Sequence, residues 1–254
     1  MNWRRWLGLT QPEPPSSAAW HTLTAGMPLL QGLRNEESER LRQLVGDFVA
    51  DKQFHGADGI EIDDRMRLLI AAQACLPILN LGLNWYRGWH SIIVYPDSFR
   101  VPYRETDQAG VVHEGEHIHD GEAWLDGPVV LSWPDVVTSA AGEYDENLVI
   151  HEFAHKLDQR DGAANGMPPL PRGMSRATWS RDFGAAFDDL NARLDEGRDA
   201  LLGDYEASAP AEFFAAVCEL FFVRPDLVHE DWPAVYAQLR TFFRQDPLGR
   251  FSIR

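Results

Sequence analysis

The sequence predicts an α+β fold that is mostly helical and contains a small mixed sheet. Helical periodicity dominates the N-terminal and the C-terminal part of the chain. Two short, apolar, β-branched segments lie between these parts, at residues 91–96 and 127–133. The 254 residues, with nine Trp and thirteen Phe, suffice for one large core. We expect residues 1–26, rich in Pro and Ser, to form a loose arm, and residues 27–254 to form a single domain.

The first two helices are predicted from apolar spacing and from proline. Residues 35–54 place several apolar side chains on one helical face, namely Leu41, Leu44, Val45, Phe48 and Val49. A second helix is expected from about Asp63 to Leu76. Pro77 ends or kinks it, because proline cannot donate the helical hydrogen bond.

The middle of the chain predicts strands, and the remainder predicts helices again. "SIIVYP" (91–96) and "GPVVLSW" (127–133) are apolar and bounded by Pro, Gly or Asp, which is typical of strands. The polar segment between them is expected to be a hairpin or an irregular loop. Further helices are predicted at residues 144–159, 178–195, 209–223 and 231–246, with a Gly/Pro/Met-rich loop over 160–177.

Composition excludes some classes of function. The net charge of −16 disfavours direct nucleic-acid binding. No signal peptide is recognisable, and the most apolar stretch, residues 68–86, is interrupted by polar residues and proline, so we expect no membrane span. Cys75 and Cys218 lie in apolar surroundings, which indicates buried thiols and a reducing compartment. We therefore expect a cytoplasmic protein.

The motif His-Glu-x-x-His occurs twice, at residues 113–117 and 151–155. On a helix this motif places two histidines side by side for zinc, and its glutamate lies close enough to activate a water molecule. The first copy has Gly115 inside it and Gly121 soon after, and its residues alternate as in a strand. In a strand, its two histidines would lie about 13 Å apart, too far to share one ion.

The second copy satisfies the helical requirement. Asp145 is a plausible N-cap, and a stripe of apolar residues can bury the helix, namely Ile150, Phe153, Ala154 and Leu157. We therefore predict zinc at His151 and His155. The alternative is a pair of histidines on an amphipathic helix that binds no metal.

A third protein ligand is expected, because catalytic zinc usually has three and keeps one position for water. Asp161 has the spacing of an extended motif, but that motif needs glycine where this chain has Asp158. Asp158 is better interpreted as a hydrogen-bond acceptor that orients a histidine or holds nearby backbone.

Two acids on the 209–223 helix are stronger alternatives. Glu212 and Glu219 are seven residues apart and so lie nearly on one line of that helix. Their spacing does not decide which of them would bind the metal. Each also has an interpretation without metal: Glu212 as an acid in the first turn, where the helix dipole favours it, and Glu219 as a charge that faces solvent. A histidine of the 113–119 segment, or His229, ranks behind both.

Three separated blocks also resemble a known family. "GPVVLSWPDV", "NLVIHEFAHKLDQRDG" and "YEASAPAEFFAAVCELFF" occur in the order found in the Mlc titration factor A family of glucose-regulated zinc metallopeptidases. The resemblance covers roughly residues 30–250. It implies a zincin-like fold, with a catalytic core related to the anthrax lethal factor protease domain and the sheet beside the active-site helix.

The same resemblance implies roles for individual residues. His151, His155 and Glu212 would bind Zn²⁺, Glu152 would be the general base, and Tyr205 would donate a hydrogen bond in the transition state. The implied function is a zinc-dependent peptidase of aminopeptidase type that acts on peptide substrates. It would also bind the transcriptional repressor Mlc and so regulate the sugar phosphotransferase system. The alternative is a non-catalytic protein that sequesters a transcription regulator and holds structural zinc.

The strand "GPVVLSW" has two interpretations within this function. As an edge strand, it would bind the backbone of a peptide substrate by strand addition. As an ordinary buried strand, it would serve the core alone.

Overall fold

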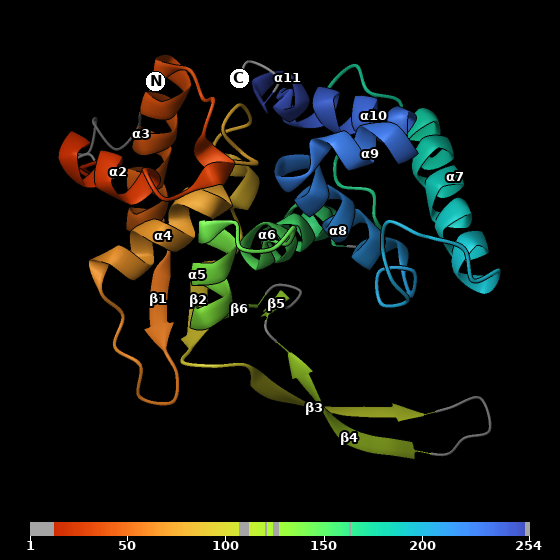
Figure 1. Cartoon of the computed structure of the whole chain (residues 1–254). Helices are drawn as coiled ribbons and strands as arrows, with labels where there is room; N and C mark the ends of the chain where they lie inside the picture. The colour runs from red at the N-terminus through yellow and green to blue at the C-terminus, as the bar shows by residue number, and fades with distance from the viewer. Residues whose placement is uncertain (1–12, 107–111, 120, 124–126, 163, 252–254) are drawn as a thin grey trace.

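The predicted α+β fold is confirmed (Figure 1). The computed structural model describes residues 13–106, 112–119, 121–123, 127–162 and 164–251, with the backbone alone over 99–106 and 112–119 and at 122 and 251. Helix α6 lies at the centre of the molecule, between helices α2–α5 on one side and α7–α11 on the other.

The N-terminal helical group has more structure than predicted. It consists of α2 (Ser17–Thr24), η1 (Pro28–Leu30), α3 (Asn35–Asp51), α4 (Asp64–Cys75) and η2 (Leu83–Tyr86). Residues 17–24 are therefore not a loose arm. Trp20 is buried, and its Nε1 donates a hydrogen bond to Ser38 Oγ at 3.1 Å, which holds α2 on the core.

The sheet is small and mixed. Three strands run parallel, β1 (Gln53–Gly56), β2 (Ser91–Tyr95) and β6 (Val129–Ser132), and β5 (Gly121–Ala123) pairs antiparallel with β6. The order is β1-β2-β6-β5. The helix predicted over 35–54 is too long, because its last residues belong to β1, which is paired with β2 from Gln53 onward.

The interpretation of residues 127–133 as an edge strand is wrong. Strand β6 has β2 on one side and β5 on the other, and all four of its residues are buried. It is the buried strand of the second interpretation. The edge on this side of the sheet is β5, which is only three residues long and shows no period in the sequence.

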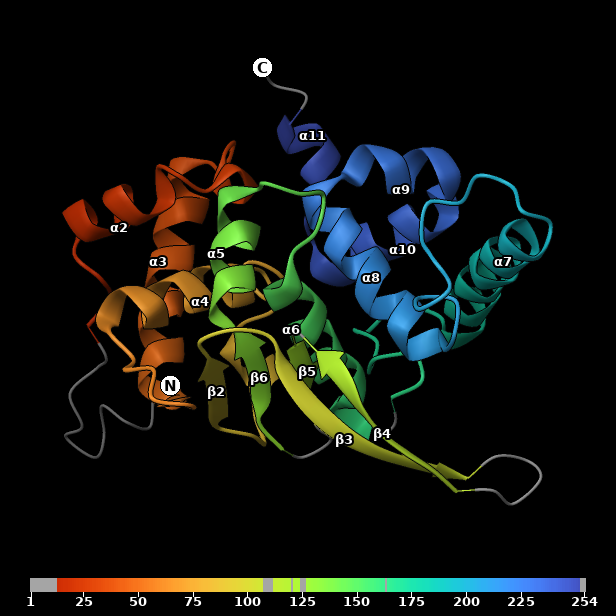
Figure 2. The ribbon, with the colours of Figure 1, turned by 60° about the horizontal axis from the view of Figure 1, so that its bottom comes forward.

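The first His-Glu-x-x-His copy lies in a strand, as its alternation predicts. Strands β3 (Phe99–Thr106) and β4 (Val112–His119) form an antiparallel hairpin in which His113 faces Glu105 and His117 faces Val101. Figures 1 and 2 show this hairpin extending from the body of the molecule.

The second copy lies on a helix, as predicted, although the helix begins later than expected. After α5 (Trp133–Ala141), which the sequence did not reveal, α6 spans Leu148–Asp158 and continues into η3 (Gln159–Asp161). Asp145 is not its N-cap. Asn147 takes that place, because its side-chain oxygen accepts the backbone N–H of Ile150 at 2.9 Å.

Five helices complete the fold. They are α7 (Arg176–Asp195), α8 (Pro210–Val223), α9 (Pro225–Asp231), α10 (Pro233–Phe243) and α11 (Pro247–Phe251). The helix predicted over 231–246 is confirmed as α10, but it begins two residues later and ends three residues earlier than predicted. Trp232 has φ −132° and ψ 66°, outside the helical region, and Pro233 has no N–H to continue a helix.

Helix α6 is held from several sides, and this determines where its polar groups can lie. It packs against α4, α5 and α8 and against strands β5 and β6. The ring of Phe153 lies 5.7, 5.1 and 5.6 Å from the rings of Phe48, Tyr86 and Trp89, centroid to centroid. Among the described residues, no helix combines the length and apolarity that crossing a membrane requires.

Candidate metal centre

The two histidines of the second motif lie one turn apart on α6 and face the same side. Their ring centroids are 5.0 Å apart, and their side chains are mostly buried. The fixed start of α6 and the apolar contacts of Phe153 on the opposite side determine this orientation. The local sequence therefore places both imidazoles where a partner helix can meet them.

That partner is α8, whose first turn carries Glu212 just after Pro210. Glu212 Oε2 lies 3.5 Å from His151 Nε2 and 3.3 Å from His155 Nε2. One ligand atom from each of these three residues lies within 4.8 Å of the other two. No other group of three metal-ligating side chains is this close in the part of the chain whose side chains are described.

The three residues fit a divalent metal such as zinc. Two imidazole nitrogens and one carboxylate oxygen are a common ligand set of catalytic zinc. Glu212 Oε2 is buried, and it lies within 3.5 Å of the Nε2 atoms of both histidines. Burial favours the neutral acid, but the imidazoles of His151 and His155 outweigh it and hold the pKa of Glu212 far below its usual value. The carboxylate is thus ionised and ready to ligate.

The electrostatics of His151 depend on two carboxylates. Burial lowers its pKa, whereas hydrogen bonding to Glu212 and Glu219 raises it, and the net effect is a pKa well above the usual value. A metal ion would replace the proton on Nε2, on the side that faces Glu212.

Glu152 is buried beside the cluster and in close contact with the edge strand. A Cβ atom at residue 121 would lie 2.6 Å from Glu152 Oε1 and 2.8 Å from its Cγ. Only glycine therefore allows β5 to approach this carboxylate so closely. Gly121 was visible in the sequence, but there it served only as an argument against a helix.

Tyr205 lies in the loop before α8, and much of the residue is exposed. Its pKa is nevertheless raised, first by partial burial and then by the negative charges of Glu212 and Glu152, with a hydrogen bond to Glu212 as a further cause. The charges of Glu212 and Glu152 therefore act on the Tyr205 hydroxyl.

Asp158 does not ligate the cluster and instead holds backbone, one of the two roles expected of it. Its Oδ2 accepts the N–H of Gly166 at 2.7 Å, in the loop that leads towards α7. A Cβ atom at residue 166 would lie 2.5 Å from the carbonyl oxygen of Pro210, at the start of α8. Burial raises the pKa of Asp158 to about 6, although the backbone N–H groups that it accepts lower it.

The other ligand candidates lie outside the cluster. Asp161 is exposed in η3, beyond the end of α6, and His229 is exposed on α9, where its ring lies beside Tyr236. The side chains of the histidines in β4 are not among those described. Glu219 lies on the other side of the His151 ring from Glu212, with its Oε2 3.1 Å from His151 Nδ1.

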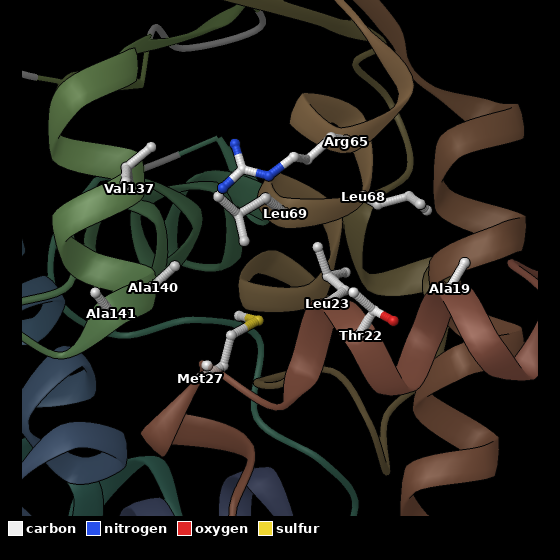
Figure 3. A pocket seen from close by; sticks show the side chains of 11 residues that line it. Ala19, Thr22, Leu23, Met27, Arg65, Leu68, Leu69, Val137, Ala140 and Ala141 are labelled. Atoms are coloured by element: carbon white, nitrogen blue, oxygen red, sulfur yellow. The ribbon is translucent and has the colours of Figure 1, made fainter.

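A cavity of about 530 Å³ lies elsewhere, lined by residues of α2, α4 and α5 and of the turn after α2, with Leu23, Met27 and Leu69 among its apolar lining residues (Figure 3). None of its lining residues belongs to the cluster. The chemistry is therefore assigned from the converging ligand atoms and not from the size of a cavity.

Comparison with known proteins gives matches over nearly the whole chain. The model of the family described as glucose-regulated metallo-peptidase M90 matches residues 1–244. Mlc titration factor A of Yersinia enterocolitica is 38% identical over 255 residues, covering 98% of this chain and 93% of that protein. Mlc titration factor A of Yersinia pestis is 37% identical over 257 residues, covering 98% and 92%.

The zinc content of two variants tests which motif holds the metal. The purified protein should contain roughly one zinc ion per chain, and His155→Ala should lose it because one of three ligands is gone. His117→Ala should retain it, since His117 lies in β4. Metal analysis of the three proteins measures this, and loss in His117→Ala alone would move the site to the hairpin.

The pH dependence of stability tests the environment of Asp158. Its pKa is raised by folding, so its favourable contribution is complete below the unfolded pKa, near 4, and is lost as the pH rises through about 6. As the pH rises from 4 to 8, the free energy of unfolding of Asp158→Asn should therefore increase by up to about 3 kcal/mol relative to that of the unmodified protein. Denaturant unfolding of the metal-free proteins measures the difference.

Asp161→Asn, an exposed acid in the next turn, is the control for this series. Its free energy of unfolding should differ from that of the unmodified protein by a nearly constant amount. If Asp158→Asn behaved in the same way, the assigned environment of Asp158 would be wrong.

Proposed function

This chain belongs to the glucose-regulated metallo-peptidase M90 family, and we propose that it hydrolyses peptide bonds with zinc held by His151, His155 and Glu212. The observation that carries the proposal is the convergence of α6 and α8, where both histidine Nε2 atoms face Glu212 Oε2. A zinc ion bound there would polarise the scissile carbonyl and lower the pKa of a water molecule towards about 7.

Glu152 acts in this proposal as the general base. It follows His151 directly on α6, and only 5% of the residue is exposed. From this position the carboxylate takes the proton of the attacking water and passes it to the leaving amine, so one residue serves both steps.

Strand β5 is the surface that we propose for the peptide backbone. It forms the edge of the sheet next to Glu152, and an extended peptide can add to such an edge through main-chain hydrogen bonds. Gln159, at the end of α6, donates a hydrogen bond to the carbonyl oxygen of Ala123 at 2.9 Å. This bond fixes β5 relative to the helix that carries the base.

Tyr205 is proposed to donate a hydrogen bond to the oxyanion that forms when water attacks the carbonyl. Support comes from its place before α8 and from the negative charges of Glu212 and Glu152, which raise the pKa of its hydroxyl. Because its pKa is raised, the hydroxyl remains protonated at neutral pH and can donate.

We propose an aminopeptidase type of specificity, which the family resemblance supports. Peptides with a free amino terminus should be cleaved, and the same peptides acetylated at that terminus should not. Equal cleavage of both would refute an aminopeptidase type of specificity.

We also propose that the chain binds the repressor Mlc, for which its relatives are named. The net charge of −16 suits a basic partner such as a DNA-binding domain. Capture of purified Mlc by a Glu152→Gln variant would separate binding from hydrolysis. Failure of the unmodified protein to capture Mlc would remove this partner while leaving the peptidase proposal standing.

Replacement of the base is the direct test of hydrolysis. Glu152→Gln should reduce peptide hydrolysis by at least about 10²- to 10⁴-fold, because the amide cannot accept the proton. Zinc content should stay unchanged, since Glu152 is not a ligand. Glu196→Gln, at the exposed end of α7, is the control and should keep full activity. Full activity in Glu152→Gln would refute the mechanism.

Tyr205→Phe tests the second catalytic role. Loss of one oxyanion donor should lower kcat by about 10²- to 10³-fold, while the zinc content stays the same. Tyr144→Phe, on the exposed loop between α5 and α6, should leave kcat unchanged and is the matched control. If the two variants had the same kcat, Tyr205 would have no part in the reaction.

A further inference from the structure

Glu219 connects a metal-binding histidine to the start of the helix that carries it. Its Oε2 lies 3.1 Å from His151 Nδ1, and its Oε1 accepts the backbone N–H of Asn147, the N-cap of α6. The residue is 9% exposed, although an unpaired carboxylate at this depth would be costly. Both of its oxygens are therefore used inside the protein.

The chemistry of a carboxylate determines what His151 can do. An ionised carboxylate only accepts hydrogen bonds, so the proton of the imidazole must be on Nδ1. The lone pair of Nε2 is then left for a metal, and Nε2 is the atom that lies 3.5 Å from Glu212 Oε2. Glu212 and Glu219 thus act on opposite nitrogens of one ring.

The contact of Glu219 Oε1 with Asn147 is held in place by further hydrogen bonds in the core. The Asn147 side chain accepts the N–H of Ile150 at 2.9 Å and donates to Gln73 Oε1 at 2.9 Å. Gln73 in turn donates to the carbonyl oxygens of Leu69 and Val136. Because Asn147 and Gln73 are fully buried, the anchor of Glu219 does not depend on a bound metal.

We propose that Glu219 is a positioning residue that holds His151 in the tautomer and ring orientation needed to bind zinc. This inference rests on the metal site of the proposed function but not on its catalysis. Helix α8 therefore supplies one carboxylate as a ligand and a second, two turns later, that orients the first histidine.

Zinc affinity of the metal-free protein, measured by competition with a fluorescent chelator, is the principal test. Glu219→Gln keeps the size of the side chain but replaces one acceptor oxygen with a donor group. It should weaken zinc binding by about 10- to 100-fold. Glu230→Gln, which makes the same chemical change at an exposed acid on α9, is the matched control, and its zinc affinity should equal that of the unmodified protein.

The tautomer of His151 gives a readout that a purely structural role would not change. In the zinc-loaded protein, nitrogen NMR should show the proton of His151 on Nδ1, and Glu219→Gln should alter this signal while the His155 signal stays the same. Should Glu219→Gln melt below the assay temperature, Glu219→Asp replaces it. The side chain of that variant keeps the charge but is one methylene shorter, which moves the carboxylate away from His151. Zinc should therefore again bind more weakly.

The inference fails if the Glu219 variants bind zinc as tightly as Glu230→Gln, or if the signal of His151 is unchanged. It fails separately from the proposed function. If the unmodified protein binds zinc through His155 and cleaves no peptide, the proposed function is wrong and the role of Glu219 stands. If zinc does not bind at all, both are wrong.

Discussion

The contact between α6 and α8 determines where the chemistry of this protein lies. Helix α6 brings two histidines and an acid, α8 brings Glu212 and Glu219, and neither helix has the whole set. Both helices are buried along most of their length, and four phenylalanines of α8 are almost inaccessible to water. Apolar burial, at roughly 25 cal/mol per Å², offsets the cost of enclosing charged groups between the helices.

The sequence was most informative where the chemistry is local. His151, Glu152 and His155 are close because they lie on one helix, and the apolar stripe around them indicated that helix. The choice between Glu212 and Glu219 was not accessible in this way, because residues seven apart lie on the same line of a helix. Only the placement of α8 against α6 puts Glu212 at the Nε2 side of His151 and Glu219 at its Nδ1 side.

Short elements and buried single residues limited the prediction of the fold. Strand β5 has three residues, fewer than an alternating pattern needs, so the sequence leaves open whether β6 is an edge strand or a buried one. The Pro and Ser content of residues 1–26 predicts a loose arm, and Trp20 alone indicates too little of the packing that holds α2 on the core. The hairpin was predictable because β4 is long enough for the alternation of His113, Gly115 and His117 to be recognised.

The hydrogen bond from Gly166 to Asp158 affects the entropy change that metal binding would involve. It fastens the loop after α6 to the end of that helix, and the same glycine lies against Pro210, two residues before Glu212. The separation between the proposed ligands of α6 and the proposed ligand of α8 is thus fixed when the chain folds. The centre is preorganised, so the entropy of gathering its ligands is lost during folding and not during metal binding. In this respect it differs from small zinc domains, in which the ion itself brings the ligands together.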